Sequence, residues 1–162
     1  MIMRITAKLG KKIGHTPSQV LPLAANPFTD WTAHVFLAER TQYIIITNTA
    51  SLYSGVMYGK GVTDNSIFLQ RVMSTLLDTL HSDGFGFIFE RLIAPDASKV
   101  FFSKSLSRAV TGSMNDLIFQ ARCCLVDADL SPFDLSFRLN ETPLSYIGHD
   151  SPREAFHKLK IA

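Results

Sequence analysis

The chain has 162 residues, of which 46% are apolar and 19% are charged, and its formal net charge at pH 7 is +2. This length and apolar content predict a single globular domain over residues 1–162, with enough chain for one core. The nearly balanced charge lacks the strongly basic character that identifies many nucleic-acid-binding domains. No apolar run approaches the length of a membrane-spanning helix, so we expect no membrane association.

The two cysteines, Cys123 and Cys124, are adjacent in a segment that we expect to be helical. Neighbouring helical residues point about 100° apart, so these thiols are poorly placed to hold one metal ion. Because there is no disulfide framework and no apolar leader, we expect a cytoplasmic protein. We expect no cofactor and no metal, since the sequence lacks a phosphate-binding glycine loop, a dinucleotide fingerprint and a paired-histidine zinc motif.

The N-terminal half predicts a short edge strand over residues 1–6 and a short helix that ends at Gly14. Residues 31–38 alternate between two faces, which is typical of a strand. A second β-rich run over residues 43–47 predicts a hairpin whose turn lies at Arg40 and Thr41.

A broad apolar stripe predicts the main core helix, which runs from about Ser66 to His81 and is capped by the polar residues before it. A second long helix is expected from Ser113 to about Val126. The segments 50–58 and 86–93 do not distinguish helix from strand.

Two serine-proline pairs near the C-terminus resemble helix starts. Residues 132–140 give conflicting signals, because their apolar residues alternate like a strand. The preceding Ser131 and Pro132 favour a helix, which we predict. A similar start at Ser151 predicts a terminal helix that ends near Lys160.

Together these elements predict an α+β fold. We expect a small, mainly antiparallel sheet with a central hairpin, packed by two long helices and several short ones. We also expect Val35, Leu76 and Leu117 to be buried in one apolar cluster.

The stretch from Ser103 to Asp116 carries the main candidate site. Its sequence, S-K-S-L-S-R-A-V-T-G-S-M-N-D, places a serine after Gly112 and an acid three residues later, which matches a capping box. A helix start offers unpaired N–H groups that favour anions, and an arginine adds a permanent, forked positive charge. The candidate anion-binding residues are therefore Arg108, Thr111, Ser113 and Asn115.

A structural interpretation of this stretch remains open. Capping alone accounts for Ser113 and Asp116, and Arg108 then pairs with the Asp116 carboxylate. The two interpretations differ in whether Arg108 is free to meet a ligand.

Three residues of the predicted hairpin are further candidates. His34 lies on one strand face and is a possible general base. Trp31, beside Asp30, can stack on a base or sugar, although a lone tryptophan at the head of a strand is more often part of the core. Arg40 adds a positive charge at the predicted turn.

Four motifs resemble those of an uncharacterised bacterial protein family with a domain of unknown function. They are T-A-K-L-G-K-K, D-W-T-A-H-V-F-L-A-E-R, T-N-T-A-S-L-Y and S-R-A-V-T-G-S-M-N-D, and they cover most of the chain in the same order. In this family an Asn often precedes the arginine of the last motif, where this chain has Ser107. The resemblance implies a bacterial, cytosolic protein and no particular activity.

Two classes of function fit these observations. The first is a non-enzymatic binding or regulatory protein that contacts an anionic group of a protein or nucleic-acid partner through a loop over residues 108–115. The alternative is a small hydrolase or transferase that acts on a phosphorylated substrate, with Arg108 holding phosphate and Asp116 or His34 as the base. We prefer the first, because the sequence does not identify a nucleophile, a base and an orienting group together.

Overall fold

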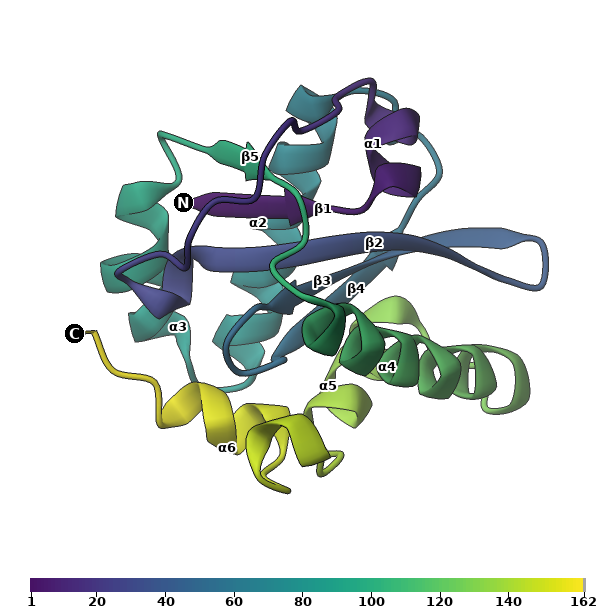
Figure 1. The fold of residues 1–162 in the computed structure, drawn as a ribbon. Coiled ribbons are helices and arrows are strands. Elements are labelled where there is room, and N and C mark those ends of the chain that lie inside the picture. The colour runs from purple at the N-terminus through teal and green to yellow at the C-terminus, as the bar shows by residue number, and fades with distance from the viewer. Residues whose placement is uncertain (162) are drawn as a thin grey trace.

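The computed structural model describes residues 1–161 and contains a five-stranded sheet with helices on both faces (Figure 1). The strands lie in the order β4-β3-β2-β1-β5. Their bounds are β1 (Ile2–Ile5), β2 (Asp30–Ala38), β3 (Thr41–Asn48), β4 (Ser54–Tyr58) and β5 (Phe101–Ser103). The predicted α+β class is confirmed.

The sheet is mixed, and both of its parallel pairings involve β1. β1 runs parallel to both β2 and β5, whereas β2 with β3 and β3 with β4 are antiparallel. The prediction that the N-terminal segment is an edge strand is therefore wrong. Its neighbour β5 comes from almost a hundred residues later in the chain, a pairing for which the N-terminal sequence carries no local signal.

The hairpin of β2 and β3 has a two-residue turn, Glu39–Arg40, one position earlier than predicted. In the described part of the chain, six helices accompany the sheet: α1 (Ala7–Ile13), α2 (Asn65–Ser82), α3 (Gly86–Ile88), α4 (Arg108–Asp127), α5 (Pro132–Asn140) and α6 (Pro152–His157). Shorter 3-10 or π turns occupy Pro27–Thr29, Phe89–Ile93, Ala94–Asp96 and Ser145–Ile147. Within residues 1–161, no helix has the length and apolar character needed to cross a membrane.

Local capping chemistry sets several of these boundaries, as the sequence predicts. Asp64 caps α2 by accepting a hydrogen bond from the Ile67 N–H at 2.8 Å, and the left-handed Gly14 ends α1. The conflict over residues 132–140 is resolved in favour of a helix, because Ser131 caps its first turn and Pro132 occupies its start. The ambiguous segment 50–58 supplies β4.

The sheet separates two apolar cores. Val35 and Leu76 are buried in the core between the sheet and α2. Leu117 is also buried, but it lies with Phe36 and Ile45 in the core beneath α4 and α5. The prediction of one common cluster is therefore wrong, because alternate residues of β2 feed opposite faces of the sheet.

Candidate anion site at the start of helix α4

Helix α4 begins at Arg108, five residues before the predicted start at Ser113. Ser107 is the N-cap, and its hydroxyl accepts a hydrogen bond from the Val110 N–H at 3.3 Å. The helix continues through Gly112, and the Ser113 hydroxyl donates to the Ala109 carbonyl at 2.9 Å. The predicted capping box at Ser113 is therefore wrong, and the expected loop over residues 108–115 is the first two turns of α4.

Arg108 and Asp116 are both exposed, and neither forms an ion pair within residues 1–161. The structural alternative, in which Arg108 is buried against Asp116, is therefore wrong. The guanidinium of Arg108 stands on the first turn of α4 with no carboxylate partner in the described part of the chain.

A small cavity brings together three of the predicted site residues. It has a volume of about 140 Å³ and lies between the start of α4 and the junction of β1 with α1. Its lining residues are Thr6, His34, Thr111, Met114 and Asn115. β2 carries His34 into the cavity, and α4 places Thr111 and Asn115 one turn apart on the facing wall.

Thr6 is a polar lining residue of this cavity that was not predicted from the sequence. Its hydroxyl lies 2.8 Å from Nδ1 of His34 and also accepts the Leu9 N–H at 3.4 Å, as the N-cap of α1. The cap was detectable in the sequence, but its position beside His34 follows from the parallel pairing of β1 with β2.

His34 is half-buried in a positively charged environment. Burial lowers the pKa of its imidazole below the usual 6.5, and the positive charges of Lys8 and Arg122 lower that pKa further. The lowered pKa favours the neutral imidazole at pH 7. In the described part of the chain, its side chain hydrogen-bonds only through Nδ1.

The basic groups around this cavity come from two helices. Lys8 is exposed on α1, and Arg122 lies on α4, where its Nε donates to the Leu37 carbonyl at 2.8 Å. Arg108, Asn115 and Arg122 follow one another at intervals of seven along α4, so they share one side of that helix. Lys8 on α1 and Arg122 on α4 thus both act electrostatically on His34, although neither lines the cavity.

The sequence profile of a family described as "Domain of unknown function (DUF6933)" matches residues 2–155. The chain belongs to this family. Searches of curated proteins and of solved structures found no match. Membership in DUF6933 agrees with the resemblance to an uncharacterised family and assigns no activity.

The remaining predicted site residues lie outside this cavity. Trp31 is fully buried, and its indole Nε1 donates to the Phe28 carbonyl at 2.8 Å, so it is part of the core. Arg40 is exposed in the hairpin turn, about 20 Å along β2 from His34 at about 3.3 Å per residue. Arg108, Ser113 and Asp116 are on α4 but do not line the cavity.

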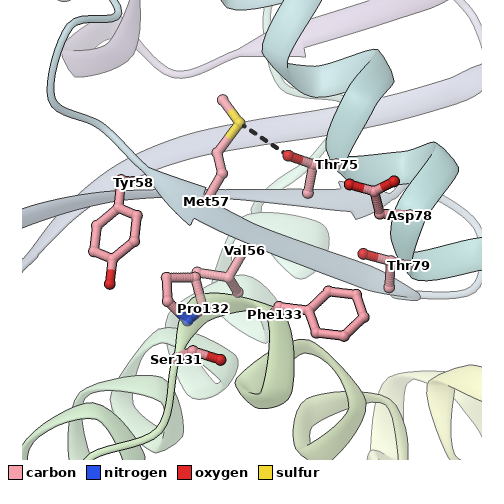
Figure 2. Close-up of a pocket in the computed structure, with 9 residues that line it drawn as sticks. All are labelled: Val56, Met57, Tyr58, Thr75, Asp78, Thr79, Ser131, Pro132 and Phe133. Atoms are coloured by element: carbon pink, nitrogen blue, oxygen red, sulfur yellow. Dashed lines mark hydrogen bonds between the residues drawn. The ribbon is translucent and has the colours of Figure 1, made fainter. Parts of the chain in front are cut away.

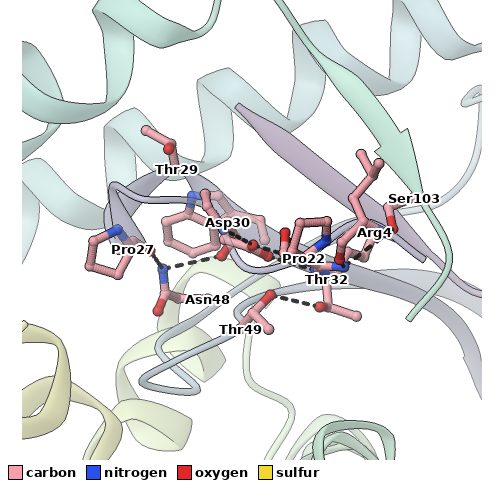
Figure 3. A network of polar contacts seen from close by, with 12 residues as sticks. Arg4, Pro22, Pro27, Thr29, Asp30, Thr32, Asn48, Thr49 and Ser103 are labelled. Carbon is pink, nitrogen blue, oxygen red and sulfur yellow. Dashed lines mark hydrogen bonds and ion pairs between the residues drawn. The ribbon is translucent and has the colours of Figure 1, made fainter. Parts of the chain in front are cut away.

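The most deeply buried charged residues were not predicted from sequence. Arg4 on β1 and Asp30 on β2 are fully buried, and two hydrogen bonds of 2.8 Å join them (Figure 3). The other donors of Arg4 reach the carbonyls of Leu21 and Pro22 and the hydroxyl of Ser103. All five guanidinium N–H donors of Arg4 thus form hydrogen bonds. Through them, the buried pair holds the segment around Leu21 and Pro22 against the sheet.

The cysteines do not contribute to the cavity. Cys123 is exposed and Cys124 is half-buried on α4, and neither lines the cavity near His34. Within residues 1–161, no group of three or more His, Cys, Asp or Glu residues is arranged to hold a metal ion.

Proposed function

We propose that this protein is a non-enzymatic binding or regulatory protein that holds an anionic group of a partner at the cavity between α1 and α4. The observation that carries this proposal is the charge around His34. Both charged groups that shift its pKa, Lys8 and Arg122, are positive. A bound phosphate or carboxylate would gain favourable electrostatic energy from both.

The polar lining suits a small anionic group. Asn115 and Thr111 can donate hydrogen bonds from α4, and Arg108 adds a forked cation on the same helix. The volume of about 140 Å³ is below the roughly 300–1,000 Å³ that is typical of small-molecule pockets. We therefore propose that one phosphate or carboxylate of a larger partner, a protein or a nucleic acid, enters this cavity. We also propose that the protein acts in the cytosol.

The test is a calorimetric titration with inorganic phosphate and with a short single-stranded oligonucleotide at low salt. We expect saturable binding that weakens as salt is added, because the contacts are between charges. Arg108→Ala and Asn115→Ala should each reduce affinity about tenfold, which corresponds to about 1.4 kcal/mol. Neither variant should lower the melting temperature appreciably, since both residues are exposed.

Arg40→Ala is the matched control, because it removes an exposed arginine far from the cavity. It should leave phosphate affinity unchanged. If wild-type protein binds neither ligand at low salt, or if Arg40→Ala weakens binding as much as Arg108→Ala, the proposed anion site is wrong.

A second candidate function is a small hydrolase or transferase that acts on a phosphorylated substrate. The contact of 2.8 Å between the Thr6 hydroxyl and Nδ1 of His34 favours it, because a neutral imidazole can accept a proton from a hydroxyl. Asp116 lies outside the cavity, so His34 is the base in this alternative. Turnover of p-nitrophenyl phosphate by wild type, lost in His34→Gln and Thr6→Val, would support it over simple binding.

A further inference from the structure

Strand β4 forms one edge of the sheet, and half of that edge is covered by side chains of α5. The Ser136 hydroxyl accepts the Val56 N–H at 2.9 Å. One helical turn later, the Asn140 amide accepts the Ser54 N–H at 2.7 Å and donates to the Ser54 carbonyl at 2.8 Å. These two side chains therefore replace a neighbouring strand along the first part of β4, as proteins often do at exposed edges.

The last part of β4 has no such cover. Ser54 and Val56 direct their backbone groups outward, whereas the N–H of Gly59 points inward and donates to the Gln42 carbonyl at 2.8 Å. Because a strand alternates, Tyr58 also directs its N–H and C=O outward. Within residues 1–161, the outward N–H of Tyr58 and the outward carbonyls of Val56 and Tyr58 have no hydrogen-bond partner.

This open edge forms one wall of a cavity of about 270 Å³ between α2 and the start of α5 (Figure 2). Its apolar lining residues include Val56 and Met57 from β4 and Pro132 and Phe133 from α5. The volume falls below the roughly 300–1,000 Å³ of typical small-molecule pockets. It suits a few side-chain atoms of a chain that continues outside the cavity.

Helix α2 supplies polar groups on the opposite wall. Thr79 is only 1% exposed, and its side chain lines the cavity (Figure 2). Asp78 is exposed, carries the only charge among the lining residues and forms no ion pair within residues 1–161. The cavity thus combines strand-pairing groups, an apolar surface and one unneutralised carboxylate.

We propose that the open end of β4 is a docking site for an extended, basic peptide segment of a partner protein. The peptide segment pairs with β4 as an additional short strand. A backbone carbonyl of the peptide accepts a hydrogen bond from the Tyr58 N–H, and backbone N–H groups of the peptide donate to the outward carbonyls of β4. One apolar side chain enters the cavity beside Phe133, and a lysine or arginine side chain reaches Asp78. This site is negatively charged and lies on the β4 edge, so it is separate from the proposed anion site at α4.

The test uses a capped heptapeptide of alternating lysine and valine as the probe, titrated into the full-length protein at low salt. We expect saturable binding and slower hydrogen exchange of the Tyr58 amide in the complex, measured by NMR. The same peptide with glutamate in place of lysine, and a backbone N-methylated version, should each bind at least tenfold more weakly. The N-methylated peptide isolates strand pairing, because it keeps every side chain.

Two variants complete the test. Asp78→Asn should weaken binding of the lysine peptide about fivefold or more, whereas the matched control Asp127→Asn, at the exposed end of α4, should not. Tyr58→Pro removes the outward N–H and should abolish binding; its fold is checked by circular dichroism. Phosphate affinity should be the same in Asp78→Asn as in wild type, which separates this site from the anion site.

Three results would overturn the proposal. They are equal affinity for the lysine and glutamate peptides, unchanged affinity in Asp78→Asn, and unchanged exchange of the Tyr58 amide at saturation. If Tyr58→Pro does not fold, the N-methylated peptide and Asp78→Asn still decide the question.

Discussion

Replacing Arg4 with methionine would show how strongly the buried ion pair stabilises the fold. Methionine keeps much of the side-chain volume but removes the hydrogen bonds to Asp30, Leu21, Pro22 and Ser103. The Asp30 carboxylate then keeps one hydrogen bond among those described, from the Ala24 N–H at 3.0 Å. A buried carboxylate without its cation is strongly unfavourable.

The expected loss for breaking such a pair is about 3–5 kcal/mol of unfolding free energy. Small domains have only about 5–15 kcal/mol in total, so this loss is a large fraction of the stability. With a slope of roughly 2 kcal/mol per molar urea, the unfolding midpoint should fall by about 1.5–2.5 M.

Urea unfolding followed by circular dichroism provides the assay. The matched control is Arg153→Met, which breaks an ion pair with Asp83 in which the arginine side chain is 48% exposed. Exposed pairs contribute about 0–1 kcal/mol, so its midpoint should move far less. A double variant, Arg4→Met with Asp30→Leu, should recover part of the loss, because the stranded charge is gone.

A loss of less than about 1 kcal/mol for Arg4→Met, or a loss no larger than that of the Arg153→Met control, would refute a stabilising role of the buried pair. Either result would mean that Asp30 finds another partner or reaches water. Failure of the double variant to recover stability would instead show that the hydrogen bonds to Leu21 and Pro22 carry the effect.

Two further predictions concern the core and the candidate site. Leu76→Ala should destabilise the protein by about 2–5 kcal/mol, because Leu76 is fully buried against the sheet; an unchanged urea midpoint would contradict this. The pKa of His34 is lower in the folded protein than in the unfolded chain. As the pH falls below about 6.5, the unfolded chain therefore binds a proton at His34 more readily than the folded protein does, and the contribution of His34 to stability is lost. Wild type should therefore lose stability between pH 7 and 5 more steeply than His34→Gln, as thermal melts across this range would measure; parallel pH profiles would refute the lowered pKa.

The sequence by its local patterns predicted those helices and strands whose periodicity or capping residues lie close together in the chain. Alternation over residues 31–38 predicted β2, the stripe through Leu76 predicted α2, and Gly14 marked the end of α1. These predictions succeeded because periodicity and caps depend on neighbours along the chain. The same chemistry misplaced the start of α4, since both Ser107 and Ser113 are competent caps and the earlier one adds a full turn of helix hydrogen bonds.

Part of the candidate site was also predictable. His34, Thr111 and Asn115 were selected as polar residues in suitable segments, and the fold brings them to one cavity. Thr6 was not selected, because nothing near it in the sequence indicates that β1 lies parallel to β2.

Only the tertiary structure decided the features that depend on contacts between distant segments. The pairing of Arg4 with Asp30 crosses 26 residues, and the cover of the β4 edge by Asn140 crosses 86. Each side chain looks ordinary in its own segment, and its role depends on which strand or helix lies beside it. Sheet order and helix placement depend on the free energy of the whole chain and not on any one segment. For this reason no local pattern predicts the two separate cores or the uncovered end of β4.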